Sequence, residues 1–207
     1  MSKKGQADAP SIIMYYLNWV DEPSHHKGVP EDENSTNSVV TVPFFNGLKA
    51  VDDFVGLSWK KINELDLADR VNFIVLSDHG MTNVNENRTI WLKDHLAEYA
   101  KQNTSSTFVD VTSPGTVINL TYGTLVDLYV MPKSTDANLK RQTTLLLYEN
   151  IKNTISMFSL QCTAYLREEI PERYHYRNNV RIPDILIVSN IGWYTGMDSS
   201  AWWGEQG

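Results

Sequence analysis

The chain has 207 residues, of which 42% are hydrophobic, and a formal net charge of −7 at pH 7. This apolar content is enough for a sizeable packed core, and the acidic balance argues against a nucleic-acid groove, which would need clustered lysine and arginine. No apolar run in the sequence approaches the roughly 20 residues of a membrane-spanning helix.

The N-terminal part of the sequence predicts a leader followed by a strand. Residues 1–10 are a short polar leader without an apolar stretch long enough for a signal sequence. Residues 11–19 (SIIMYYLNW) are an apolar run of strand length, and polar residues that include Asp21 and His25 follow them. A surface loop is the alternative interpretation of these polar residues, and Pro23 favours it.

The next stretch predicts a helix and a second strand. Apolar residues recur at steps of three and four over residues 46–67, which is typical of an amphipathic helix. Residues 73–77 (FIVLS) then give four apolar positions without alternation, as in a strand buried on both faces of a parallel sheet. Asp78, His79 and Gly80 follow directly, so a metal site or a simple Asp-His-Gly turn could lie at the strand end.

The order strand, helix, strand predicts where these polar side chains meet. Such a unit is right-handed and parallel, so both strand ends lie at one edge of the sheet. Asp21, His25, Asp78 and His79 are therefore expected to share that edge. Two carboxylates and two imidazoles form a ligand set suited to zinc or a similar divalent ion.

The remainder of the chain predicts mixed α/β structure. Helices are expected over residues 90–100 and 138–157, and strands over residues 108–111, 117–120, 125–131, 159–166 and 185–189. The fold class is α/β: a mainly parallel sheet flanked by helices, with a small inserted α+β block. Cys162 is the only cysteine, so it is either a buried small hydrophobe or half of a disulfide to another segment.

Three segments carry a family resemblance. They are YLNWVDEPSHHKGVP (residues 16–30), FIVLSDHGM (residues 73–81) and EIPERYHYRNNVRI (residues 169–182). Together they resemble the nucleotide pyrophosphatase/phosphodiesterase family of the alkaline phosphatase superfamily, and they span nearly the whole chain.

The resemblance implies a two-zinc site. Asp21 and His25 would hold one Zn²⁺, and Asp78 and His79 would share the other. Family members also have a nucleophilic threonine and an aspartate upstream of the first motif, and nothing ahead of Ser11 supplies them. Gln206 stands where a metal-binding histidine is expected. Residues 11–207 are accordingly expected to form a partial catalytic domain in which both zinc sites are incomplete.

The implied activity is metal-dependent hydrolysis of nucleotide phosphodiester or pyrophosphate bonds, with nucleotides or other phosphodiester small molecules as partners. The chain by itself is expected to be impaired or inactive. Two alternatives stay open: a non-catalytic metal- or phosphate-binding protein that keeps the fold, or a fragment whose unpaired sheet edges prevent stable folding.

Family members act outside the cell or on its surface, so an extracellular glycoprotein is expected. The sequence has four N-glycosylation sequons, at Asn34, Asn87, Asn103 and Asn119. They agree with this location, although so short a motif also arises by chance in a chain rich in asparagine and threonine.

Overall fold

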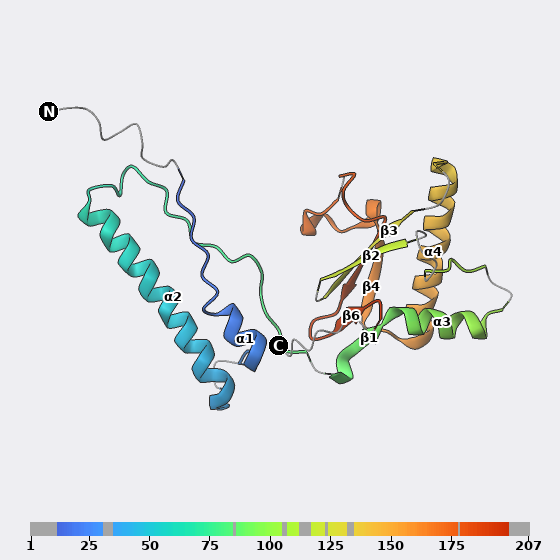
Figure 1. Cartoon of the computed structure of the whole chain (residues 1–207), viewed down its shortest axis with the longest axis horizontal. Helices are drawn as coiled ribbons and strands as arrows, with labels where there is room; N and C mark the ends of the chain where they lie inside the picture. Colours follow the sequence, from blue (N-terminus) through green and yellow to red (C-terminus); the bar gives the residue numbers. More distant parts are fainter. Residues whose placement is uncertain are drawn as a thin grey trace. The chain divides into compact units, whose positions relative to one another are not determined.

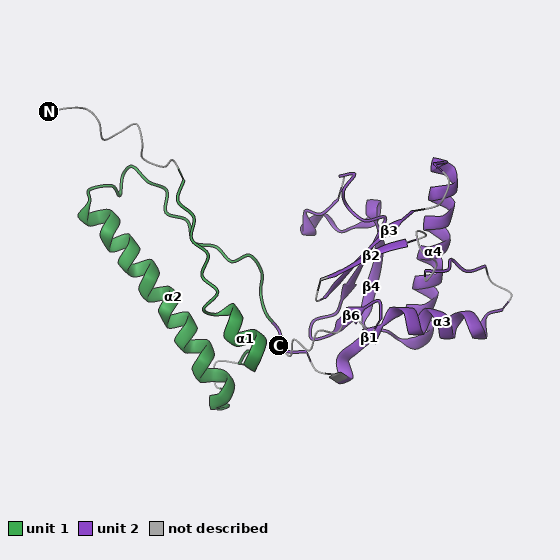
Figure 2. Cartoon of the chain, in the orientation of Figure 1, with its two compact units in different colours: residues 1–81, 207 green, residues 82–206 purple. Residues whose placement is uncertain are grey.

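The structure is a computed structural model that describes residues 12–30, 35–84, 86–104, 107–111, 117–122, 124–131, 135–177 and 179–198. The chain divides into two compact units, residues 1–81 with 207 and residues 82–206 (Figure 2). The predicted leader and Gln206 lie outside the described residues.

The first unit contains two helices, α1 (Asp21–Lys27) and α2 (Ser38–Glu64). The prediction of a loop after residue 19 was wrong, because Pro23 lies in the first turn of α1. Backbone N–H groups there have no intrahelical acceptor, so proline costs no hydrogen bond. Acidic residues in the first turn and His25 in the last turn also complement the helix dipole.

Helix α2 begins earlier than the periodicity predicts. The Asn37 side chain caps the helix by accepting a hydrogen bond of 3.2 Å from the Val39 amide. The start of α2 contains no charged residue to mark a solvent-facing side, and Pro43 there is a usual signal against a helix. Local capping therefore determines the start of the helix.

The two strands predicted for the first unit are absent. Residues 12–18 and 71–77 are irregular in the structure, as Figure 1 shows. Burial on both faces was also wrong, since Ile74 and Leu76 are 74% and 79% exposed. A strand needs a paired neighbour for its backbone groups, and among the described residues these segments pair with no strand but contact α2. Aromatic rings make that contact: Tyr15 packs on Phe54 and Phe73 on Trp59.

The second unit contains the sheets. Its helices and strands are β1 (Thr89–Trp91), α3 (Leu92–Gln102), β2 (Val117–Tyr122), β3 (Leu125–Val130), α4 (Ala137–Phe158), β4 (Cys162–Leu166), β5 (Ile185–Ser189) and β6 (Tyr194–Gly196). Short 3₁₀ turns are η1 (Glu86–Arg88), η2 (Arg167–Glu169) and η3 (Glu172–Tyr174). Strands β1 and β6 pair in parallel, while a four-stranded antiparallel sheet has the order β2-β3-β5-β4 (Figure 1).

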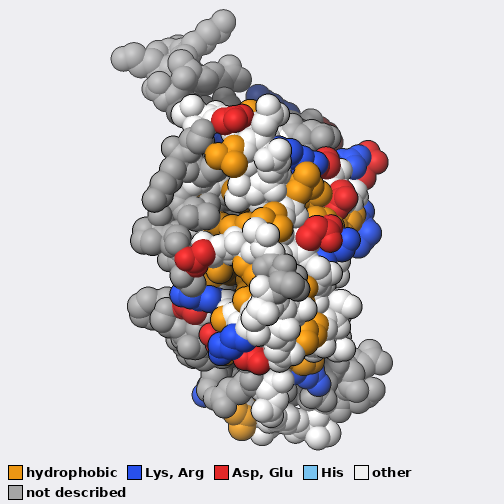
Figure 3. Space-filling model, turned by 90° about the vertical axis from the view of Figure 1, so that its right-hand side faces the viewer, with side chains coloured by type: hydrophobic (Ala, Val, Ile, Leu, Met, Phe, Trp, Pro, Cys, Tyr) orange, Lys and Arg blue, Asp and Glu red, His pale blue; other side chains and the backbone are white. Residues whose placement is uncertain are grey.

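The core of the second unit lies between one face of this sheet and helices α3 and α4. Alternate residues of β3, Val126, Leu128 and Val130, are fully buried there. Leu147 and Ile151 come from α4 and are buried in the same cluster. A smaller cluster of Ile170, Ile182 and Leu186 is also buried. Figure 3 shows an outer surface on which lysine and arginine alternate with aspartate and glutamate around scattered hydrophobic side chains.

Most predictions for this unit are confirmed. Helices α3 and α4 and strands β2, β3, β4 and β5 fall within about three residues of the predicted ranges at most boundaries, a usual margin for helix and strand ends. The strand predicted over residues 108–111 is absent, and the three-residue strands β1 and β6 were missed. Cys162 is buried and free, which agrees with its interpretation as a small hydrophobe. The α/β fold class is confirmed, but the described strands do not form the mainly parallel sheet that the sequence predicts. Only β1 and β6 pair in parallel, whereas β2, β3, β5 and β4 pair as antiparallel neighbours, because the two segments expected to build the parallel unit are irregular.

Candidate metal centre

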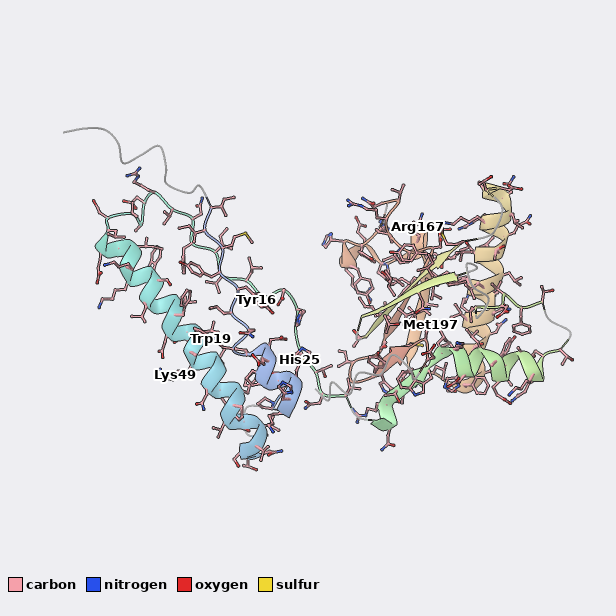
Figure 4. All side chains as sticks on the ribbon, viewed as in Figure 1. Tyr16, Trp19, His25, Lys49, Arg167 and Met197 are labelled. Carbon is pink, nitrogen blue, oxygen red and sulfur yellow. The ribbon has the colours of Figure 1, made fainter. Side chains whose placement is uncertain are left out.

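Asp21 and His25 lie on one face of α1. They are four residues apart, and that spacing places helical side chains above one another. The Nε2 atom of His25 lies 3.4 Å from Oδ1 of Asp21. Figure 4 shows His25 on α1. The Gly28 amide ends the helix by donating to the Ser24 carbonyl at 2.8 Å.

His79 reaches the same carboxylate from another segment of the first unit. Its Nε2 lies 3.9 Å from Oδ1 of Asp21 and 3.8 Å from Oδ2 of Asp78. The turn that holds it is built from local hydrogen bonds. The His79 amide donates to Oδ1 of Asp78 at 3.1 Å, and the Ser77 hydroxyl donates to the His79 carbonyl.

A backbone hydrogen bond determines which nitrogen of the neutral His79 ring carries the proton. Nδ1 lies 2.9 Å from the Gly80 carbonyl oxygen, which can only accept, so Nδ1 carries the proton. In the neutral imidazole, Nε2 then presents a lone pair toward Asp21. This pattern, in which a carbonyl holds one ring nitrogen and the other is left free, is usual for a metal-binding histidine.

The Asp21 carboxylate has an unsatisfied oxygen. Oδ1 is buried and accepts no hydrogen bond from the residues that the structure describes. A buried acceptor without a partner is costly and rare in native proteins. A cation, or a proton on one of the two nearby imidazoles, would satisfy it.

The electrostatic environment favours positive charge. The hydrogen bond to the Gly80 carbonyl raises the pKa of His79 above its ordinary value, partial burial opposes this, and the charges of Asp78 and Asp21 add to the increase. The same negative field that holds a proton on His79 would attract a metal ion, so protons and metal compete for this site.

The structure thus brings the rings of His25 and His79 close to one oxygen of Asp21, and Asp78 lies beside His79. Among the described residues, however, no group of three or more potential ligands is arranged closely enough to hold an ion. The donor atoms fit a zinc-like ion in type, while their spacing is that of an open cluster.

Sequence reasoning missed the residues that orient this cluster. Ser77 and Gly80 shape the His79 turn through backbone contacts, which no side-chain pattern reveals. The helical position of Asp21 and His25 could have been found from their spacing of four. His175, in the third of the family-like segments, is exposed in the second unit and has a left-handed conformation with φ of 48° after η3.

Two carboxylates and two histidines in an α/β protein are typical of metal-dependent hydrolases, so this is the class of protein with which the chain is compared. The chain belongs to the type I phosphodiesterase/nucleotide pyrophosphatase family, whose family model matches residues 1–203. No helix in the described part of the chain combines the length and the apolar character needed to cross a membrane.

Curated relatives agree with this family. The chain is 31% identical over 198 residues to the bis(5'-adenosyl)-triphosphatase ENPP4 of Pongo abelii, a match that covers 93% of the chain and 34% of that protein. It is 28% identical over 183 residues to ectonucleotide pyrophosphatase/phosphodiesterase family member 7 of Mus musculus. The chain thus spans about a third of the length of these relatives.

Solved structures support the same fold. Murine ectonucleotide pyrophosphatase/phosphodiesterase 5 matches with a TM-score of 0.52 and 22% identity, covering 87% of this chain and 38% of that one. An inactive form of that murine protein in complex with AMP matches with a TM-score of 0.50 and 23% identity. At this identity the likeness concerns the alkaline-phosphatase-like fold alone.

Proposed function

We propose that this chain supplies metal ligands to a hydrolase of nucleotide phosphodiester or pyrophosphate bonds, with Asp21, His25, Asp78 and His79 as those ligands. One observation carries the proposal: a buried oxygen of Asp21 lies unsatisfied between two imidazoles that come from separate segments. A packing role would not require two histidines beside an unpaired carboxylate.

Zinc is the metal that we propose for this cluster. Histidine nitrogen and aspartate oxygen are both common zinc ligands. Bound zinc would polarise a phosphoryl oxygen and lower the pKa of a water molecule. The residues of the chain hold the donors in place: α1 sets the spacing of Asp21 and His25, and the Gly80 carbonyl keeps the proton of His79 on Nδ1.

The substrate class that we propose is nucleotides. The names of two matched proteins support it, since one is a bis(5'-adenosyl)-triphosphatase and another was solved with AMP. We also propose an extracellular or cell-surface location and N-glycosylation. The name of a matched ectonucleotide pyrophosphatase/phosphodiesterase supports the location, and the four sequons support the glycosylation.

A second candidate function is non-catalytic binding of metal or phosphate. Catalytic zinc sites usually have three protein ligands, whereas the four residues here would leave only two for each of two ions. The absence of a closed group of three among the described ligands favours this candidate for the 207-residue chain by itself. We therefore expect this chain alone to bind zinc and to turn over substrate slowly.

The test is hydrolysis of a chromogenic nucleotide phosphodiester by the zinc-loaded chain. Under the enzyme hypothesis, Asp78→Ala lowers the rate at least tenfold, and the neighbouring Asp69→Ala, outside the cluster, leaves it unchanged. Zinc binding without any turnover would favour the non-catalytic candidate. Turnover that survives Asp78→Ala would contradict the assignment of the site.

A further inference from the structure

The structure separates the glycosylation sequons by accessibility. Asn103 is half-buried, and its side-chain Nδ2 already donates to the Tyr99 carbonyl at 2.9 Å near the end of α3. Asn87 is exposed in η1, and Asn119 is exposed in the middle of β2. Asn34 lies outside the described residues. Asn119 therefore stands out as an accessible acceptor on a sheet.

Strand β2 is an edge strand without the usual protection. It is the first strand in the order β2-β3-β5-β4, and among the described residues no other strand pairs with its outer side. Proteins usually guard such edges with a charge, a proline or a bulge. The sequence of β2, VINLTY, contains no charged residue and no proline, and its register with β3 pairs every residue one to one.

Hydrophobic side chains of β2 are also exposed beside this unpaired edge. Ile118 and Leu120 are 48% and 41% exposed. They share one face of the strand, and Asn119 projects from the other because side chains alternate. A six-residue, uncharged strand with exposed β-branched and aliphatic side chains is a typical site for unwanted strand pairing.

We propose that Asn119 is N-glycosylated and that its glycan guards the β2 edge against pairing with another strand. A glycan is bulky and strongly hydrated, so at the centre of this strand it would obstruct an approaching backbone along most of the edge. The proposal rests on the extracellular placement proposed above.

The modification transfers the oligosaccharide from a lipid pyrophosphate carrier to the side-chain amide of Asn119. The Asn119 Nδ2 atom forms a bond to C1 of the first sugar, and the bond between C1 and the lipid pyrophosphate oxygen breaks. The pyrophosphate lipid leaves, and the amide nitrogen loses one proton. The Thr121 hydroxyl completes the acceptor sequence.

The test uses the full chain behind a cleavable secretion signal in eukaryotic cells, in the background Asn34→Gln, Asn87→Gln and Asn103→Gln. We expect the mass of one glycan, removable by peptide N-glycosidase, in the medium or in the protease-protected microsomal fraction. Adding Thr121→Ala abolishes it, while Thr121→Ser retains it. Translocated chain without a glycan overturns the proposal.

The added secretion signal brings the chain into the secretory pathway whatever its natural location, so the glycosylation result does not depend on the proposed function. Zinc-dependent hydrolysis by the same chain is unaffected by whether Asn119 is modified, and the natural location is tested independently by locating the untagged protein in its own cells. Failure at Asn119 with hydrolysis intact would therefore reject the glycan alone.

The guarding role has its own readout, which is self-association measured by light scattering. We expect Asn119→Gln to self-associate at several-fold lower concentration than the glycosylated chain. Adding Leu120→Lys, which places a charge on the edge, should restore the glycosylated behaviour. Equal self-association with and without the glycan would contradict the guarding role.

Discussion

At the scale of single residues, two buried aspartates of the second unit show how partners decide the cost of a charge. Asp184 is buried but is held by Arg167 at 3.0 Å, Lys140 at 2.9 Å and the Val130 amide at 2.9 Å. Asp127, on β3, is 5% exposed and accepts one hydrogen bond of 3.2 Å, from the Tyr176 hydroxyl. Burial raises the pKa of Asp127, and the Tyr176 hydrogen bond opposes that rise.

This difference predicts a pH dependence of stability. At pH values between the ordinary Asp pKa of 3.8 and the raised pKa in the folded protein, the folded state binds more protons at Asp127 than the unfolded state does. The free energy of unfolding should therefore fall as pH rises through that window. Asp127→Asn removes this fall and keeps an acceptor for Tyr176, so at pH 7 we expect its free energy of unfolding to be higher than that of the wild type.

Urea unfolding of both proteins at several pH values between 3 and 7 measures this effect. Two curves that remain parallel over the whole range would show that Asp127 titrates normally. Asp184→Ala serves as a contrast: it leaves Arg167 and Lys140 without their carboxylate, so it should destabilise by about 3 kcal/mol.

The thiol of Cys162 gives a second prediction at this scale. Burial in the core raises its pKa to about 11, against a small opposing hydrogen bond from Thr195. The reactive thiolate is therefore scarce at pH 8. We expect a disulfide reagent to modify the folded chain at least tenfold more slowly than the urea-unfolded chain. Equal rates would mean that Cys162 is open to solvent.

At the scale of elements, the contact between α2 and the segment before α1 positions Asp21 of the proposed metal centre. A Cβ atom at Gly47 of α2 would lie 2.0 Å from the Trp19 carbonyl oxygen, closer than any real contact. Trp19 also packs on Phe54 of α2, with ring centroids 6.2 Å apart, and lies between the two helices in Figure 4. Gly47 thus lets the backbone that leads to Asp21 approach the helix.

Gly47→Ala should displace that backbone. We expect it to weaken zinc binding about tenfold, the lower end of what second-shell changes cost at metal sites. Gly56→Ala is the matched control, because its Cβ would meet nothing within 4 Å on the same helix. It should leave zinc affinity unchanged and stabilise α2 by about 0.5–1 kcal/mol. Calorimetric titration of both variants decides, and equal affinities would reject the positioning role of Gly47.

The same scale shows what sequence patterns can and cannot predict. Helix α4 and strand β5 followed from periodicity and apolar composition, which are local properties. Residues 73–77 have equally strong strand composition, but pairing depends on a neighbouring strand that no local pattern encodes. Helix α1 was missed because Pro23 signals a loop in general and is harmless only in a first helical turn.

The candidate site likewise has features that the sequence could predict and features that it could not. The four proposed ligands were chosen from their motifs, because Asp and His carry metal-binding chemistry in their side chains. The orientation of His79 could not be predicted, since it depends on the carbonyl of Gly80. The closeness of His79 to Asp21 was expected from a strand pairing that is absent, and it arises in the structure without that pairing.

At the scale of the whole molecule, the two units differ in how they are stabilised. Every buried hydrophobic side chain among the described residues belongs to the second unit. In the part of the first unit that the structure describes, the buried residues are Ser24, Gly28 and Gly47, and long apolar segments are exposed. Stability from apolar burial is therefore concentrated in the second unit.

Native-state hydrogen exchange should reveal this difference. Amides of β3 and β5 are expected to exchange only on global unfolding, whereas those of α2 exchange through local opening, at least a hundredfold faster. Added zinc should slow exchange in α1 and leave β3 unchanged, because a ligand stabilises what binds it. Uniform protection of both units would contradict the separation.

The most direct test of the metal centre is zinc affinity and stoichiometry of the purified chain, with paired histidine variants. His79→Ala and Asp21→Ala should each weaken zinc binding at least tenfold. The exposed His26→Ala, next to His25 on α1, and His175→Ala, in the second unit, should bind as the wild type does. Equal zinc affinity in all four variants would show that Asp21 and His79 do not form the metal site.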